Sequence, residues 1–212
     1  MLPTITEEKI DLPPGTVIQF PASIAEYEQL LDRLGDRSIP RLRFRDNRIL
    51  LMSPLPEHGK EIDVIADLVK MLLRHQGLDW DSFHPITLKY MTNGLEPDAC
   101  FYIQNFRSIL GKRKIDLSVD PPPDLAIEID VTSFTHIEDY IPLAIPEVWI
   151  YRGNKLRVYC FTDNSYIETE TSSIFPNFSI KEIVSQYVSR AWQVGSSVAL
   201  NEFSQTLEKT SD

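Results

Sequence analysis

The sequence lacks long hydrophobic runs. Its longest apolar stretches, such as Leu125–Ile127 and Val148–Tyr151, fall far short of the roughly 18 to 20 residues that cross a bilayer. The amino end, MLPTITEEKI, has acidic residues where a signal peptide has basic ones, and it lacks an apolar core. We therefore expect a cytoplasmic protein with no membrane span.

Cysteine is scarce as well. Cys100 and Cys160 are the two cysteines, and each lies in an apolar, strand-like run without forming a CxxC pair. The ligand spacing of a structural zinc site is absent. Both side chains are therefore predicted to be small buried hydrophobic groups in a reducing compartment.

An excess of positive charge is also missing. The chain has 31 acidic and 21 basic residues, which gives a formal net charge of −10. This balance argues against a protein that coats nucleic acid in general, because such binding depends on neutralising phosphates. It does not exclude a nuclease, whose basic groups need to line only one cleft. The local basic clusters Arg41–Arg48 and Arg107–Lys114 are predicted to be solvated surface.

What is present is the composition of a globular domain. Apolar residues make up 42% of the chain, aromatic residues 10% and charged residues 25%, with no low-complexity tract or internal repeat. The 212 residues suffice for one domain with a sizeable core. We expect an extended amino-terminal arm over residues 1–20, a single domain over 21–192, and a helical extension or tail over 193–212.

Two helices are predicted in the first half of the chain. Ser23 and Glu26 form an S-x-x-E capping box ahead of an apolar stripe, and Gly35 ends that helix. The turn SPLPEHG, residues 53–59, leads into a second helix with apolar residues at helical spacing, which ends at Gly77.

A third helix is predicted near the carboxyl end. Ser179 and Glu182 repeat the capping box, and the helix has one wide apolar face that must pack on the sheet or on a second copy of the chain. The predicted strands are a hairpin that turns at Asp46-Asn47 and ends at residue 52, then 83–90, 98–103, 124–131, 147–151, 155–162 and 165–170. This order indicates an α+β or mixed α/β domain with a central sheet flanked by helices.

Two of the predicted strands carry carboxylates. Asp98 precedes one apolar run, and Asp124 precedes another in which Glu128 and Asp130 lie deeper. Because side chains alternate along a strand, Ala126, Glu128 and Asp130 share one face while the other face is apolar. The acids are either solvated on a half-exposed strand or buried together, and a divalent cation usually compensates such buried charge. If the two strands are neighbours, Asp98 and Glu128 can approach a common ion.

The acidic strands resemble a known family. A Pro-Asp entering one strand, with PPDLAIEID about thirty residues later, is similar to the restriction endonuclease-like family (Uma-type, formerly a domain of unknown function) of the PD-(D/E)XK nuclease superfamily. LLMSPLPEHGKEIDVIADLV is similar to that family's Met-Ser-Pro segment, and IPEVWIYRGNKLRVYCF to its Pro-Glu-x-Trp strand and the next strand. The likeness covers roughly residues 40 to 190.

The resemblance implies a restriction endonuclease-like core with a central mixed β-sheet flanked by helices. In that core Asp98 and Glu128 would hold Mg²⁺ or Mn²⁺, with Glu57 as a third acid. Such a metal polarises the scissile phosphate and a lysine normally stabilises the developing charge. The implied activity is metal-assisted hydrolysis of phosphodiester bonds. We expect DNA as the substrate and a homodimer, because cutting both strands favours paired sites and the carboxy-terminal helix offers an apolar face.

The sequence departs from the family at the expected lysine. Asp130 stands two residues after Glu128, where the superfamily has Lys, and no lysine occurs between Lys114 and Lys155. Relatives often supply the lysine from the following helix, and alignment back from IPEVW places His136 there. Three readings stay open: His136 substitutes as a pH-dependent donor, Asp130 joins the metal site, or the enzyme is degenerate.

The positions of five further residues indicate their expected roles. His58 either satisfies a helix-start turn or faces the cleft, and Tyr102 and Gln104 are expected to border the cleft on the face of the acids. Glu147 and Trp149, in PEVW, are expected to serve the fold rather than the chemistry.

Two functions therefore compete. The first is a magnesium-dependent endonuclease, favoured by the retained acids, since a core that has lost its function tends to lose costly buried charge. The second is a catalytically degenerate protein that keeps the fold for binding or assembly, favoured by the missing lysine and the net charge of −10. A glycosidase would need an acid and a base flanking a sugar cleft, and the aromatic distribution does not indicate one.

Overall fold

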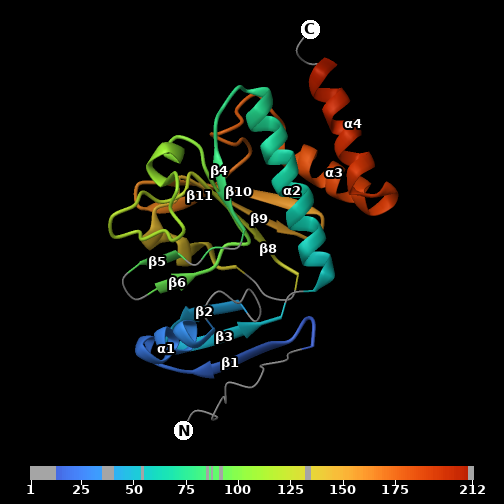
Figure 1. Cartoon of the computed structure of the whole chain (residues 1–212). Coiled ribbons are helices and arrows are strands. Elements are labelled where there is room, and N and C mark those ends of the chain that lie inside the picture. The colour runs from blue at the N-terminus through green and yellow to red at the C-terminus, as the bar shows by residue number, and fades with distance from the viewer. Residues whose placement is uncertain are drawn as a thin grey trace.

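A computed structural model describes residues 13–34, 41–53, 55–84, 86, 88–90, 93–131 and 135–209. Within these ranges the chain forms two β-sheets with helices against them (Figure 1). Most of the expected amino-terminal arm lies outside the described residues, as does Gly35, the expected end of the first helix. The described end of that arm, Val17–Pro21, is a strand.

The smaller sheet is antiparallel and lies at the amino-terminal end of the molecule. Its strands run in the order β1 (Val17–Pro21), β3 (Arg48–Met52), β2 (Arg41–Arg45), β6 (Asn93–Leu95) and β5 (Leu88–Tyr90), and α1 (Ile24–Leu34) packs on it. The predicted hairpin is confirmed: Asp46 and Asn47 have φ of 50° and 55° between β2 and β3, as a type I′ turn requires. Leu42 and Phe44 face Tyr27 of α1 in a small core.

The larger sheet is mixed. Its strands run in the order β11 (Ser165–Thr169), β10 (Lys155–Thr162), β9 (Glu147–Arg152), β8 (Leu125–Ile129), β7 (Ala99–Tyr102) and β4 (Asp81–Phe83). Among the strands that the structure describes in this sheet, only β8 and β9 pair in parallel. The single strand expected over 83–90 is wrong, because β4 ends at Phe83 in this sheet while β5 begins at Leu88 in the other.

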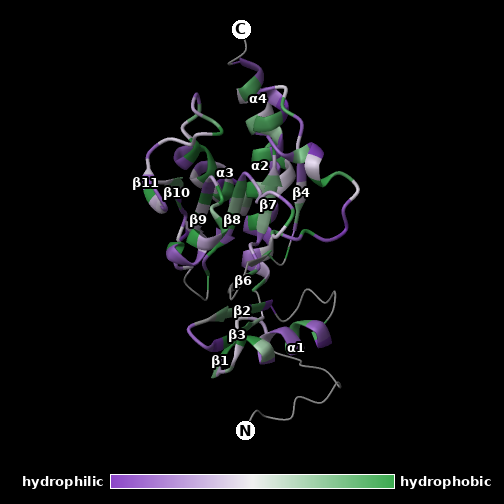
Figure 2. Cartoon of the chain, turned by 90° about the vertical axis from the view of Figure 1, so that its left-hand side faces the viewer, coloured by the Kyte–Doolittle hydropathy of each residue, from purple (hydrophilic) through white to green (hydrophobic). Residues whose placement is uncertain are grey.

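Helices α2 (Pro56–His75) and α3 (Ile180–Val194) lie against one face of the larger sheet, and α4 (Ser196–Lys209) packs on both of them (Figures 1 and 2). The main core joins their apolar faces to the side chains of Leu125, Ile127 and Ile129 on β8. The apolar face of the predicted third helix, including Val184 and Val188, is therefore covered within the chain. Most of that face therefore needs no second copy of the chain to bury it, while Trp192 remains 48% exposed.

The opposite face of the larger sheet is covered by shorter pieces. They include two 3-10 helices, η1 (Phe106–Ile109) and η2 (Ile137–Leu143), and the β5–β6 pair of the smaller sheet. Leu88 and Leu95 of that pair cluster with Ala126 of β8 and Tyr140 of η2. The two sheets thus meet on the face of β8 that bears its carboxylates.

The helix ends agree with the sequence in part. Glu26 Oε2 accepts hydrogen bonds from Ser23 N (2.7 Å) and Ser23 Oγ (2.9 Å), and Glu26 N donates to Ser23 Oγ (3.3 Å), so the first capping box is confirmed. The second box is wrong. The side chain of Ser179 makes no capping hydrogen bond. The backbone at the start of the helix forms a tight turn, in which Ile180 N donates to Phe178 O (2.9 Å).

Cys100 is buried and Cys160 partly buried, and both thiols are free, as expected from the sequence.

The remaining expectations concern the surface and the fold class. Arg107–Lys114 carries its basic side chains exposed, as expected, whereas Arg41–Arg48 does not do so uniformly. Within the described part of the chain no helix is long and apolar enough to cross a membrane. The fold class expected from the sequence, a mixed sheet flanked by helices, is confirmed.

Ala144, at the end of η2, gives a testable feature of the fold. It is exposed and has φ of 49° and ψ of 37°, a left-handed conformation in which its Cβ is strained. Ala144→Gly is expected to raise the free energy of unfolding by about 0.5 to 1 kcal/mol, because relief of that strain exceeds the added backbone entropy of glycine. Urea denaturation measures the change. Asn154→Gly, also at positive φ, should gain less, and an equal gain would contradict this account.

Candidate active site where the two sheets meet

Asp98 and Glu128 lie opposite each other on neighbouring strands. β7 and β8 pair antiparallel with Ala99 opposite Ile127, and continuing that register by one residue sets Asp98 opposite Glu128. Their exposed fractions are 3% and 2%, so the solvated, half-exposed strand considered from the sequence is wrong. Two carboxylates in this position need strong compensation by hydrogen bonds or positive charge.

Asp98 receives that compensation from three elements. Its Oδ2 accepts a hydrogen bond from the backbone N–H of Ile129 (2.7 Å) and lies 2.8 Å from Nε2 of His58, at the start of α2. Its Oδ1 forms an ion pair with the guanidinium group of Arg41 on β2. Asp98 therefore ties the larger sheet to both α2 and the smaller sheet.

Glu128 is compensated in a similar way. Its Oε1 accepts hydrogen bonds from Arg43 on β2 (2.5 Å) and from the hydroxyl of Tyr140 in η2 (2.5 Å). Burial raises the pKa of Glu128, while Arg43 and the Tyr140 hydroxyl act to lower it. Burial, with the negative charge of Glu128, raises the pKa of Tyr140 well above its ordinary value. The phenol therefore stays protonated and donates a hydrogen bond to Glu128.

Asp130 belongs to the same group through a shared neighbour. Both of its carboxylate oxygens accept a hydrogen bond from Thr135 N at 3.0 Å, and Oδ1 also accepts one from Thr135 Oγ1 (2.8 Å). Arg43 donates to that same hydroxyl at 3.4 Å. Asp130 thus holds Thr135 next to Arg43.

His58 and Glu57 are neighbours in the sequence, but His58 is buried and Glu57 is exposed. Burial, together with Arg41 and Arg43, lowers the pKa of His58 to about 4, so its ring is neutral at neutral pH and donates from Nε2 to the carboxylate of Asp98. Successive helical residues point about 100° apart, which explains why His58 meets the buried acids and its neighbour does not.

The other predicted site residues lie away from Asp98. Tyr102 is at the far end of β7, where its hydroxyl donates to Pro121 O (3.1 Å). Gln104 is exposed beyond that end, and its backbone N–H donates to Asp124 (3.0 Å). His136 is exposed at the start of η2, beside Thr135. Tyr102 and Gln104 therefore do not border the acids, since Asp98 and Tyr102 lie four positions apart, at opposite ends of β7.

The sequence reasoning missed Arg41 and Arg43. Both lay in the basic cluster interpreted as solvated surface, which is wrong for them: Arg43 is 9% exposed and the Arg41 side chain 13%. Arg48 of the same hairpin is exposed, as expected. The signal was the alternation RLRFR, which places arginines on one face of β2 and Leu42 with Phe44 on the other.

A divalent cation fits the donors here but not the charge around them. Carboxylates are the ligands that such ions prefer, and Asp98 with Glu128 supplies two. Both are already paired with guanidinium groups. Among the described residues no group of three or more His, Cys, Asp or Glu side chains is placed to hold a metal ion. With both carboxylates paired to arginines, a divalent cation can bind Asp98 and Glu128 only where those ion pairs open.

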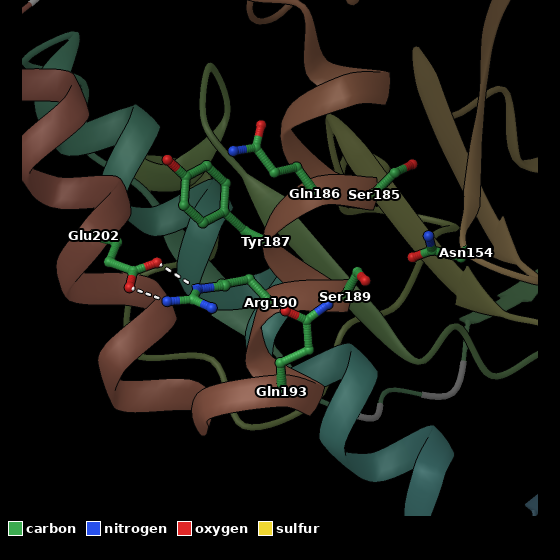
Figure 3. A pocket seen from close by; sticks show the side chains of 8 residues that line it. All are labelled: Asn154, Ser185, Gln186, Tyr187, Ser189, Arg190, Gln193 and Glu202. Carbon is green, nitrogen blue, oxygen red and sulfur yellow. Dashed lines mark hydrogen bonds and ion pairs between the residues drawn. The ribbon is translucent and has the colours of Figure 1, made fainter.

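A separate cavity of about 450 Å³ lies between α3, α4 and the β9–β10 turn (Figure 3). Tyr187, Gln186 and Asn154 are among its lining residues. Its cation, Arg190, is held by two hydrogen bonds to Glu202 (2.8 and 2.7 Å), drawn as dashed lines in Figure 3. The cavity is formed by helices that lie on the side of the larger sheet opposite the acids, so it is not part of the Asp98 site.

Comparison with known proteins bears on both the fold and this site. The sequence model of the family described as "Uma2: Putative restriction endonuclease" matches residues 24–191, which include every residue of the site. A crystal structure described as that of "a putative nuclease belonging to DUF820" from Anabaena variabilis ATCC 29413 has a TM-score of 0.53 with this chain at 14% sequence identity. It covers 79% of this chain and 99% of its own. None of the curated proteins matches.

Proposed function

The chain belongs to the Uma2 family, and from this premise we propose that it is an endonuclease that hydrolyses phosphodiester bonds in DNA. One observation carries the proposal. Asp98 and Glu128, far apart in the sequence, lie opposite each other, buried, on adjacent strands of a mixed sheet. Burying two facing acids is costly even when cations compensate them, and titratable groups arranged in this way mark a candidate functional site; the family resemblance supports nuclease activity for it.

Each side chain has a role in this proposal. Asp98 and Glu128 are the essential acids, and Mg²⁺ or Mn²⁺ is the proposed cofactor because hard cations prefer oxygen ligands. A divalent ion there would withdraw charge from the phosphate oxygens. Neutral His58 orients the Asp98 carboxylate, and Tyr140 does the same for Glu128. Asp130 holds Thr135 and through it the Arg43 guanidinium group.

The second candidate function is a nuclease-fold protein that has lost catalysis and acts in binding or assembly. Two observations favour it. The lysine of the superfamily is absent, with Asp130 in its place, and the buried acids are already neutralised by arginines. In this case the ion pairs would be structural joints between the two sheets.

Incubation of the purified chain with supercoiled plasmid separates these functions. Under the endonuclease proposal, Mg²⁺ or Mn²⁺ is expected to produce nicked or linear DNA, and EDTA to prevent it. Linear product without accumulated nicked circles would support the proposed homodimer, since paired sites cut both strands together. Intact plasmid under every metal condition, with folded protein, would favour the degenerate alternative.

A further inference from the structure

The two buried arginines reach the acids from a different sheet. Arg41 and Arg43 lie on one face of β2, while Leu42 and Phe44 on its other face pack with α1. The apolar face anchors the strand in the smaller sheet, so the two guanidinium groups are presented at the edge of the Asp98 site. Among the described residues these are the cations that contact its carboxylates.

Neither guanidinium group is fully satisfied. The Nε atoms of Arg41 and Arg43 are both buried and have no hydrogen-bond partner in the described part of the chain. An arginine has five N–H donors, and a buried donor without an acceptor is unfavourable. The missing acceptors bring no advantage if the ion pairs are purely structural. A ligand with several acceptor oxygens could accept hydrogen bonds from the two Nε–H groups.

We propose that Arg41 and Arg43 are the phosphate-binding cations of this site, and that in the free protein Asp98 and Glu128 hold them in the place of a divalent cation. This inference rests on the proposed function and deepens it. The planar guanidinium fork matches the oxygens of a phosphodiester. Because arginine stays protonated, it stabilises negative charge without serving as a base, which is the task that the missing lysine would otherwise perform.

Charge balance couples the binding of a phosphodiester to the binding of a divalent cation. In the free protein two arginines balance two carboxylates. A phosphate that took both guanidinium groups would leave Asp98 and Glu128 buried without compensation, and a divalent cation alone would add positive charge beside two arginines. The two ligands carry charges of opposite sign, so each offsets the imbalance that the other creates. Phosphodiester and divalent cation should therefore bind cooperatively, each raising the affinity of the other by the same factor.

The binding test uses a fluorescently labelled DNA duplex and Ca²⁺ as the cation probe, with binding followed by fluorescence anisotropy. For the unmodified chain, Ca²⁺ is expected to tighten DNA binding by about tenfold relative to EDTA. The double variant R41Q/R43Q should lose this gain, and Arg48→Gln, an exposed arginine of the same hairpin, should keep it. Equal Ca²⁺ dependence in R41Q/R43Q and the unmodified chain would overturn the proposal.

The second test measures the melting temperature and needs no DNA. Mn²⁺ alone should leave the unmodified chain unchanged, because the arginines already neutralise the acids. R41Q/R43Q should melt lower in EDTA and be stabilised by Mn²⁺, because its carboxylates have lost their cations. Stabilisation of the unmodified chain to the same extent would contradict the inference. If R41Q/R43Q does not fold, R41K/R43K replaces it; this variant keeps the charge but loses the fork, so it should lose DNA affinity without gaining an Mn²⁺ response.

Neither test requires DNA cleavage. A chain that shows both responses yet never cuts plasmid would refute the endonuclease while supporting the arginine assignment. If the chain cuts plasmid but R41Q/R43Q binds DNA with the same affinity and Ca²⁺ dependence as the unmodified chain, the endonuclease is supported and the arginine assignment is refuted.

Discussion

Asp98→Asn and Glu128→Gln are each expected to lower the rate of plasmid cleavage by at least about a hundredfold, the scale on which loss of one charge-stabilising group acts. Each substitution removes a full negative charge from the buried pair and keeps nearly the same shape. The expectation follows from the proposed endonuclease function. Its measurement is the initial rate of conversion of supercoiled plasmid in Mg²⁺, with protein purified identically for every variant.

The matched control is Glu138→Gln. Glu138 is an exposed acid in η2, close in sequence to Tyr140 but outside the buried pair, so this variant should keep the parental rate. The melting temperature of each variant is needed as well, because Glu128→Gln weakens the partner of the buried Arg43. Cleavage that persists in both site variants would mean a contaminating nuclease or a site elsewhere in the chain.

Glu147→Ala is expected to lower the free energy of unfolding by about 3 to 5 kcal/mol. Glu147 is fully buried at the start of β9. Its carboxylate accepts hydrogen bonds from Trp149 Nε1 (2.6 Å), Ser172 Oγ (2.6 Å), Ser173 N (2.7 Å) and Ser173 Oγ (2.6 Å). Alanine would leave Trp149 Nε1 and Ser172 Oγ without this acceptor in the core, which is the origin of the large effect, whereas the exposed Ser173 can bind water instead.

The same carboxylate fixes the segment that precedes α3. Ser172 Oγ, which donates to Glu147, accepts hydrogen bonds from Ile174 N (3.1 Å) and Phe175 N (3.0 Å). Phe175 is fully buried, with its ring 6.0 Å from that of Trp149. Glu147 therefore joins β9 to the packing of the third helix and has a structural role, as the sequence suggested.

Chemical denaturation at neutral pH measures the effect. Glu170→Ala is the control, since Glu170 lies near Ser172 in sequence but its side chain is 90% exposed and pairs only with Lys181 among its described contacts. A surface change of this kind usually shifts stability by less than about 0.5 kcal/mol. If Glu147→Ala lost no more than this control, the hydrogen-bond network would have no energetic importance.

Together the two sets of variants separate chemistry from architecture. Both involve buried acids of the larger sheet, yet the acids differ in their surroundings. Glu147 accepts from neutral hydroxyl, indole and backbone donors, whereas Asp98 and Glu128 are bound to guanidinium groups. Neutral donors within one sheet and its flanking loop stabilise a fold, while charge brought from a second sheet points to the binding of a charged ligand.

Local patterns were sufficient to predict much of the fold. The period of two in LAIEID placed Glu128 and Asp130 on the face opposite the apolar core, and the packing of β8 agrees. Ser23 with Glu26 and the Asp46-Asn47 turn were also predictable, because each feature depends on residues within about four positions of one another. The resemblance to a family then linked Asp98 to Glu128.

Local patterns failed where the answer depended on distant segments. Residues 83–90 read as one strand because nothing in their own sequence shows the passage from one sheet to another. Ser179 had the pattern of a capping box, but the backbone before it follows the turn from Phe175 to Phe178. Phe175 N is in turn held by Ser172, whose hydroxyl donates to the distant Glu147. Tyr102 shared the parity of Asp98 along β7 yet lies at the other end of the strand.

The amino-acid sequence alone indicated a sheet flanked by helices, placed Glu128 and Asp130 on one face of their strand, and showed an acid two residues after Glu128, where the superfamily that it resembles has a lysine. Only the tertiary structure decided what neutralises those acids. Arg41 and Arg43 precede Asp98 by more than fifty positions and belong to another sheet, so no spacing rule connects them to it. The electrostatic energy of a buried charge depends on distance in space, and that distance exists only once the two sheets have packed together.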